Sequence, residues 1–297
     1  MKCQASPFFC LIYNPLYINE TANMKHLFLF ISIIATTLFS AHAQSKALKN
    51  SNILVYTKNG TGYVHDNIPS AVEALKKLAE QEQFNITVSD DPSIFTEEQI
   101  KKYTLIVFPS TNNDVFATDA QRLVFRRYIE AGGGMVGLHS VTGTERNWKW
   151  FKMLIGCTFS WHAKFQKFTV RVTDPAHPSM KDVPLVWERE DELYFGKELY
   201  PVTNVMMAHQ FTTLDQSQKD QISKNAGTYT EYYPAVWYNH FQGGHAWIST
   251  IGHSKQTYSD PVYVNHLVQG LRFVASKVKK VDFANAYATH RDDEIKR

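Results

Sequence analysis

The stretch GGGMVGLHS, residues 132–140, decides the fold of this chain. Its glycines end a segment with helical periodicity, and the short apolar run Met135 to Leu138 follows them. A run of this length, bounded by turn residues, is typical of a strand that is buried on both faces of a parallel sheet. Two polar residues, His139 and Ser140, come directly after it. In parallel sheets ligands bind at the carboxyl ends of the strands, so this turn is the first candidate for a site.

The residues before this stretch alternate between strand and helix patterns. Apolar strand patterns cover residues 53–56, 84–88 and 105–108. Helical spacing runs from Ile68 to Ala79 and from Thr118 to Ala131, with Leu123, Val124, Tyr128 and Ala131 expected on one face. Thr96 with Gln99 and Thr118 with Gln121 have the spacing of capping boxes. The alternation predicts a mainly parallel sheet with helices on both faces. Its ligand-binding loops would be 58–66, 109–114 and the turn at His139.

The second half of the chain is richer in strand patterns. These cover residues 168–172, 205–208, 235–238 and 246–251, and a last helix places apolar residues from Val264 to Val278 on one stripe. Without an internal repeat or a low-complexity linker, one α/β domain over residues 52–276 is preferred, with β-rich additions in its second half. Residues 277–297 read as a basic and polar tail, in which Lys277, Lys279 and Lys280 form a solvated helix end.

Composition narrows the class of protein. The chain has 297 residues, 44% of them hydrophobic, and a formal net charge of +3, which is typical of a globular domain. Its Lys and Arg residues form no stripe interleaved with aromatic residues, so we expect no nucleic-acid partner.

The N-terminal region has the pattern of a signal peptide over residues 24–43. Met24-Lys25-His26 is a short positive start, residues 27–39 are an apolar run, and Ala41-His42-Ala43 is a small-x-small site with cleavage expected between Ala43 and Gln44. The alternative is a buried helix of a larger domain. A signal peptide predicts a periplasmic or secreted protein, and residues 1–23 would then be an extension from a start codon assigned too early.

Cysteine placement agrees with export. Cys3 and Cys10 lie in that extension, so the mature domain would hold only Cys157 and no intramolecular disulfide. No cysteine directly follows the apolar run, so neither a lipoprotein anchor nor another stable membrane anchor is expected.

Histidines are the most frequent residues at candidate site positions. Two of the twelve, His26 and His42, lie in the targeting segment, which leaves ten in the mature chain. Five follow or end predicted strands: His65, His139, His162, His240 and His253. Imidazole suits acid–base chemistry near neutral pH and binds zinc and similar metals. The pattern Gly137-Leu138-His139-Ser140 lacks the second glycine of a serine-hydrolase elbow, so Ser140 is not expected to be a nucleophile.

Two further motifs supply carboxylates. Asp66 follows His65, where it is expected to cap the next helix while His65 faces the pocket. Glu192, in the run Glu190-Asp191-Glu192 before Tyr194, could orient a histidine, act as a general base or complete a metal site. A solvated acidic loop is the alternative for this run.

Together these motifs resemble the trehalose-utilisation, or ThuA-like, family of the class I glutamine amidotransferase-like superfamily. The resemblance runs from Ile53 to Val274. Its motifs are GYVHDNIP (62–69), GGMVGLHS (133–140), Gly156 through Phe159 to His162, DELY (191–194), PAVW (234–237) and Gly252-His253. It implies a flavodoxin-like three-layer fold and a link to sugar metabolism. Glutamine amidotransferases carry a cysteine at the elbow, where this chain has His139, so glutamine hydrolysis through a thiolate is not expected.

These observations predict an exported protein that acts on a glycoside or keto-sugar, as a hydrolase, lyase or isomerase. The candidate catalytic residues are His139, Glu192 and His65, and the candidate substrate-binding residues are Tyr63, Asp66, His162, Tyr194 and His253. No cofactor is indicated with certainty, and a divalent metal, if bound, would use His65, His139 and His253. The alternative is a non-catalytic carbohydrate-binding module, in which Tyr63, Trp161, Tyr194 and Trp237 stack on sugar rings unless they are core residues.

Overall fold

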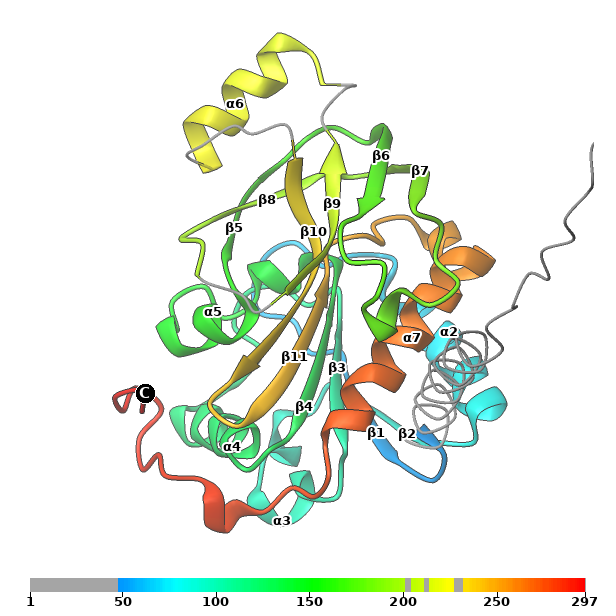
Figure 1. Cartoon of the computed structure of the whole chain (residues 1–297). Helices are drawn as coiled ribbons and strands as arrows, with labels where there is room; N and C mark the ends of the chain where they lie inside the picture. Colours follow the sequence, from blue (N-terminus) through cyan, green and yellow to red (C-terminus); the bar gives the residue numbers. More distant parts are fainter. Residues whose placement is uncertain (1–47, 201–203, 211–213, 227–231, 297) are drawn as a thin grey trace, which may run out of the picture. The chain divides into compact units, whose positions relative to one another are not determined.

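The structure is a computed structural model that describes residues 48–200, 204–210, 214–226 and 232–296 (Figure 1). All of them belong to one compact unit, 43–297. The expected extension 1–23 and signal peptide 24–43 lie outside the described residues. Within the described ranges, no helix is long and apolar enough to cross a membrane.

The first half of the chain forms the parallel part of a nine-stranded sheet. Strands β1 (Asn52–Tyr56), β2 (Asn85–Ser89), β3 (Leu105–Pro109) and β4 (Gly134–Leu138) lie in the order β2-β1-β3-β4, and all pair in parallel. They coincide with the predicted strands to within one or two residues. Their carboxyl ends therefore meet at one edge of the sheet.

The second half continues the same sheet with antiparallel strands. Strand β11 (Gly244–Ser249) pairs in parallel with β4, and β10 (Tyr232–Phe241), β9 (Asn204–Gln210), β6 (Gln166–Val172) and β7 (Val186–Asp191) follow outward. Strands β5 (Thr158–His162) and β8 (Tyr194–Lys197) form a separate antiparallel pair. The sequence patterns predicted β6, β9, β10 and β11 but missed β5, β7 and β8.

Helices cover both faces of the parallel part, which confirms the predicted three-layer α/β fold (Figure 1). Helices α2 (Ile68–Glu82) and α7 (Pro261–Lys277) pack on one face, and α4 (Asp119–Glu130) and α5 (Lys149–Ile155) on the other. Successive residues of β3 belong to opposite cores: Leu105 and Val107 pack with the first pair of helices, Ile106 and Phe108 with the second. This is why the strand reads as a continuous apolar run. The remaining helices are α3 (Glu97–Ile100), α6 (Gln216–Ala226) and the 3-10 turns η1 (Pro92–Ile94), η2 (His139–Gly143), η3 (Pro178–Met180), η4 (Lys255–Ser259) and η5 (Phe283–Asn285).

Helix α4 departs from its predicted burial. Its Thr118–Gln121 capping box is present. The expected face is confirmed only in part, because Tyr128 and Ala131 are buried whereas Leu123 and Val124 are only partly buried. The buried apolar residues are Phe125, Tyr128 and Ile129, and they are accompanied by an Arg126–Glu130 ion pair of 2.8 Å that has no exposed side-chain surface.

The C-terminal segment explains this burial. The guanidinium of Arg126 donates to the carbonyl oxygens of Arg291 (3.0 Å) and Asp293 (2.7 Å). The carboxylate of Glu130 accepts from the amides of Tyr287 (3.0 Å) and Ala288 (2.9 Å). Residues 287–294, which the sequence placed in a tail, thus lie against α4. A charged pair is tolerated at this depth because the backbone of that segment satisfies it.

Candidate functional site

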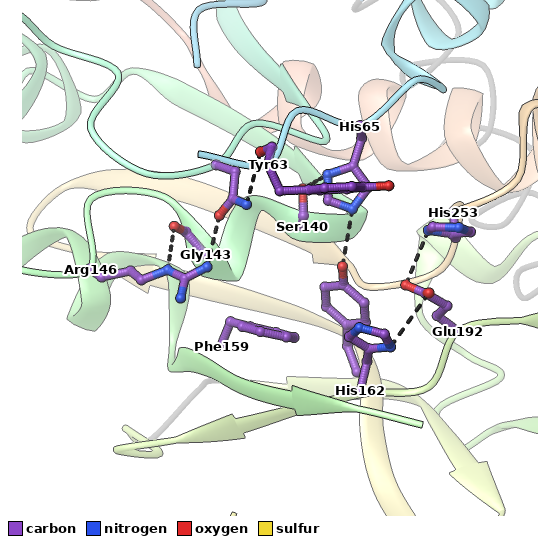
Figure 2. Close-up of a pocket in the computed structure, with 11 residues that line it drawn as sticks. Tyr63, His65, Ser140, Gly143, Arg146, Phe159, His162, Glu192 and His253 are labelled. Carbon is purple, nitrogen blue, oxygen red and sulfur yellow. Dashed lines mark hydrogen bonds and ion pairs between the residues drawn. The ribbon is translucent and has the colours of Figure 1, made fainter. Parts of the chain in front are cut away.

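A cleft of about 390 Å³ opens at the carboxyl edge of the parallel strands (Figure 2). Its walls come from the loops after β1, β3, β4 and β11, from β5, and from the turn between β7 and β8. The lining residues are Tyr63, His65, Asn112, Ser140, Gly143, Arg146, Phe159, His162, Glu192, Tyr194 and His253. Six predicted site residues, from Tyr63 to His253, are therefore brought together although they are up to 190 positions apart in sequence, by subtraction of those two numbers.

His139 lies directly beneath this cleft. It is fully buried and has a positive φ of 47°, a strained backbone conformation for a residue other than glycine. Its ring Nδ1 donates to the carbonyl oxygen of Thr250 at 3.1 Å, which leaves the lone pair of Nε2 directed at His253. Burial, together with the nearby His65 and His253, holds the pKa of His139 well below its usual value, so its ring is neutral.

Glu192 connects His253 and His162 across the cleft (Figure 2), and it also approaches the buried His139. Its Oε2 lies 3.1 Å from Nδ1 of His253 and 3.9 Å from Nε2 of His139, and its Oε1 lies 3.4 Å from Nδ1 of His162. The same Nδ1 of His253 lies 3.2 Å from Nε2 of His139. The hydrogen bond with the Glu192 carboxylate raises the pKa of His253.

Asp191 anchors the two loops that carry Glu192 and His253. Its fully buried carboxylate accepts hydrogen bonds from the backbone amides of Glu192, Gly252 and His253, each at 2.9 Å. Burial raises the pKa of Asp191, and Arg189 and these amides oppose that rise. The acidic run is therefore not a solvated loop: Asp191 positions the site, Glu192 faces it, and Glu190 is exposed on β7.

His65 is held by two hydroxyl groups. Ser140 donates to the carbonyl oxygen of Thr111 (3.0 Å), so its oxygen accepts from Nδ1 of His65 (3.1 Å). This leaves Nε2 of His65 as the acceptor from the Tyr194 hydroxyl at 3.2 Å. Burial, and then the charge at His253, lowers the pKa of His65 to about 4. Ser140 lines the cleft, but its proton is committed to the backbone.

The opposite wall of the cleft was not predicted. Arg146 donates to the Asn112 side chain and to the Gly143 carbonyl oxygen, each at 2.9 Å, and its guanidinium lies 5.3 Å from the ring centre of Phe159. Asn112 falls in loop 109–114, which strand-end reasoning had selected. Arg146 carried no sequence signal, and Phe159 stood in the motif from Gly156 to His162 without a predicted role, because the turn and the strand on which they lie were not predicted.

Four predicted residues lie away from the cleft, one of them Trp161, which is partly buried and stacks on Phe195 with 5.6 Å between the ring centres. The Asp66 side chain is 72% exposed and pairs with Lys255 at 2.7 Å, outside the lining of the cleft. The predicted capping role of Asp66 is wrong, because Asn67 occupies the N-cap of α2 and makes no side-chain capping bond. His240 pairs with His245, whose neighbour on β4 is Gly134, so it lies at the opposite edge of the sheet. Trp237 is a core residue that donates to the Ile155 carbonyl oxygen.

Cys157 is unsuited to nucleophilic chemistry. It is buried outside the cleft, and burial raises the pKa of its thiol to about 12. A thiol with this pKa stays protonated near neutral pH.

The sequence and the fold of the chain are similar to those of known proteins. The profile of the ThuA family, described as trehalose utilisation, matches residues 52–274. Two solved structures of ThuA-like proteins are similar in fold. The one from Bacteroides uniformis has a TM-score of 0.63 and 23% identity, over 76% of this chain and 91% of that chain. The one from Parabacteroides merdae has a TM-score of 0.59 and 18% identity, over 76% and 90%.

A cytoplasmic protein from Salmonella typhimurium is also similar, with a TM-score of 0.53 and 13% identity over 75% of this chain and 98% of that chain. At these identities the likeness concerns the fold alone. A comparison with curated proteins gave no match.

Proposed function

The chain belongs to the ThuA family of trehalose utilisation, and on that premise we propose that it is an exported protein that acts on a glycoside or keto-sugar in the cleft beside Glu192. The observation that carries this proposal is the arrangement of one carboxylate and several imidazoles around a single cleft. Glu192 lies within 3.1–3.9 Å of nitrogens of His253, His162 and His139.

The dimensions of the cleft suit a small sugar. Ligand pockets span about 300–1,000 Å³, and this cleft of about 390 Å³ is near the lower end of that range. Tyr63 and Phe159 offer aromatic surface for the apolar face of a sugar ring, and Asn112 and Arg146 offer polar contacts to hydroxyl groups.

The number of carboxylates in the cleft favours proton transfer over the usual mechanism of glycoside hydrolysis, which needs two. Most glycosidases use two carboxyl groups that flank the scissile bond. Glu192 is the one carboxylate among the described lining residues, and the neighbouring Asp191 is fully buried and committed to three backbone amides. We assign Glu192 the removal or return of a proton at a carbon next to a sugar carbonyl. His253, whose pKa is raised by Glu192, would stabilise the charge that develops on the carbonyl oxygen, while the neutral ring of His139 positions the His253 ring through their 3.2 Å contact. The neutral ring of His65 lines the cleft beside them.

Glutamine amidotransfer is not supported. His139 occupies the turn after β4 where a nucleophilic cysteine would be required, and the buried thiol of Cys157 lies outside the cleft. A neutral, fully buried imidazole cannot replace a thiolate in that reaction.

Export is the second part of the proposal, supported by the Met24–Ala43 pattern alone. Expression of the full chain in a bacterial host, followed by fractionation and N-terminal mass spectrometry, tests it. We expect an N-terminus at Gln44 in the periplasm or medium. A cytoplasmic chain that retains residues 24–43 would contradict it.

The assay for the sugar activity is a panel of glycosides and their 3-keto forms, offered to the purified chain and to two matched variants. Glu192→Gln keeps the size of the side chain and removes the base, so we expect turnover to fall by about 10²–10⁴-fold. Glu190→Gln makes the same change two residues away on an exposed position and should leave turnover unaltered. Equal turnover in both variants would sink the assignment of Glu192.

A non-catalytic sugar-binding module is the second candidate. It is favoured by Tyr63, whose side chain is 62% exposed beside the cleft and could stack on a sugar ring. Thermal stabilisation by sugars that are not converted, lost in Tyr63→Ala and kept in Glu192→Gln, would select this alternative.

A further inference from the structure

We propose that His65, His139 and His253 bind one divalent transition metal ion, of the zinc class, at the floor of the cleft beside Glu192. The role of the ion rests on the proposed function, whereas its binding can be tested without any sugar. A ring nitrogen of each histidine lies within 4.8 Å of the others.

The separations are close to those of ligands around one ion. In a tetrahedral site, bond lengths of about 2.0–2.2 Å place neighbouring ligand atoms about 3.3–3.6 Å apart, slightly farther than the two shortest separations here. The observed distances are 3.2 Å from Nε2 of His139 to Nδ1 of His253, and 3.1 Å from that Nδ1 to Oε2 of Glu192. The three imidazole planes meet at 63–89°, so they are not stacked on one another. His65 lies within 4.8 Å of the other two, and it completes the set when its Nε2 exchanges the Tyr194 hydroxyl for the ion.

Outer contacts already fix two of the rings for metal binding. Metal-ligating histidines almost always donate their second ring N–H to a carbonyl or another polar group. Nδ1 of His139 donates to the Thr250 carbonyl oxygen, which leaves Nε2 free to bind. Nδ1 of His65 donates to Ser140, which is itself held by Thr111.

Nδ1 of His253 faces two hydrogen-bond acceptors at once. Its Nδ1 lies within hydrogen-bond distance of the His139 lone pair and of the Glu192 carboxylate, yet it carries at most one proton for these two acceptors. A cation at this point would satisfy all three groups. Three imidazoles with one carboxylate suit zinc and similar ions, whereas magnesium and calcium prefer oxygen ligands.

The ion would have an open side. His139 is fully buried, but the His253 and Glu192 side chains are 26% and 12% exposed, and both line the cleft. Catalytic zinc sites keep such an open position for water or substrate. When bound, the ion would polarise a sugar carbonyl or hydroxyl oxygen.

The test is metal binding by the full chain, purified with an affinity tag that contains no histidine so that the tag itself binds no zinc. After treatment with a chelator, the protein is titrated with zinc by calorimetry, and cobalt(II) is added to a second sample for its visible absorption spectrum. We expect one saturable zinc site per chain and a cobalt spectrum typical of nitrogen coordination. His65→Ala and His253→Ala should each weaken zinc binding by at least about tenfold.

His240→Ala is the matched control, because it removes an exposed imidazole at the opposite edge of the sheet, away from the three histidines and Glu192; it should retain the site. His139 is not substituted, since its strained and buried position could prevent folding. The absence of saturable binding at micromolar zinc, or equal affinity in all variants, would overturn the proposal. One zinc ion per chain without sugar turnover would leave the metal site standing and remove only the proposed function. Full sugar turnover in chelator-treated protein would overturn the role of the ion in the reaction, whereas its binding is decided by the titration.

Discussion

Nε2 of His139 lies 3.2 Å from Nδ1 of His253, although 114 positions separate the two residues in the sequence. The contact forms because β4 and β11 are parallel neighbours, so the turns that follow them meet at one edge of the sheet. It places a neutral, buried imidazole against one that also faces a carboxylate, and the chemistry proposed for the cleft depends on this pair.

The Asp191 carboxylate should be essential for holding this arrangement. Asp191→Asn replaces one accepting oxygen by an NH₂ group that faces backbone amides, and it removes a buried negative charge that lies 3.9 Å from Arg189. Leaving buried donors without acceptors costs about 1–3 kcal/mol, more when a charge is involved. We expect the free energy of unfolding in urea to fall by about 2–4 kcal/mol. A change under about 0.5 kcal/mol, as expected for Glu190→Gln, would contradict the anchoring role.

The Arg126–Glu130 pair should couple the C-terminal segment to α4. Arg126→Ala leaves Glu130 buried without its partner and frees the carbonyl groups of residues 291 and 293. Breaking a buried pair from one side costs about 3–5 kcal/mol. We expect a fall in Tm of roughly 6–20 °C, at about 2–4 °C per kcal/mol for a domain of this size. Lys76→Ala, which breaks an exposed pair with Glu73, serves as the control; an equal effect of the two substitutions would refute the coupling.

Two buried histidines remote from the cleft should make stability depend on pH. Burial lowers the pKa of His209 and His266 to about 3 each, compared with about 6.5 in an unfolded chain. Between pH 6.5 and 3 the unfolded state therefore binds more protons than the folded state, so unfolding becomes easier as pH falls. The slope is at most about 1.4 kcal/mol per pH unit for each histidine.

Urea unfolding at pH 7, 6 and 5 measures this slope. His266→Gln removes one of the two groups, so we expect its stability to decline less steeply below pH 6.5 than that of the wild-type chain. Parallel declines in the two proteins would show that His266 takes no part.

Gly252 should be required for the position of His253. Its φ is 123°, and a Cβ placed there would lie 2.5 Å from the hydroxyl oxygen of Tyr263. Gly252→Ala should therefore shift the loop, lower Tm and weaken whatever ligand the cleft binds. Gly62→Ala offers a comparison, since its φ of 130° is equally unusual but its nearest contact is the flexible amide of Asn113. Calorimetry on both variants measures Tm and ligand affinity. If Gly252→Ala left the ligand affinity unchanged, this role of Gly252 would be excluded.

The parallel half of the fold could be predicted from the sequence because its strands are buried on both faces. Leu105 to Phe108 contact helices on both sides, so every residue is apolar and the run is visible without an alignment. Strand β7 could not be found in this way, because exposed charged residues such as Glu188 and Glu190 alternate with the buried Trp187 and Arg189. Burial of a guanidinium depends on partners such as Asp260 that only the fold brings near.

The candidate site was predictable to the extent that strand ends determine it. His65, His139 and His253 follow β1, β4 and β11, whose carboxyl ends share one edge. The same reasoning misplaced His240, because β10 runs antiparallel and its last residues lie at the other edge. It also missed Arg146 and Phe159, whose positions depend on elements with no periodic pattern.

The central claim, proton transfer by Glu192 at a carbon beside a sugar carbonyl, is tested most directly by deuterium exchange. The purified chain is incubated with a 3-keto-glycoside in D₂O, and the hydrogens at the neighbouring carbons are followed by NMR. We predict that the chain speeds deuterium incorporation at one such carbon, that Glu190→Gln does the same, and that Glu192→Gln slows it by about 10²-fold or more. Incorporation at the uncatalysed rate with wild-type protein, or at equal rates with both variants, would contradict the account.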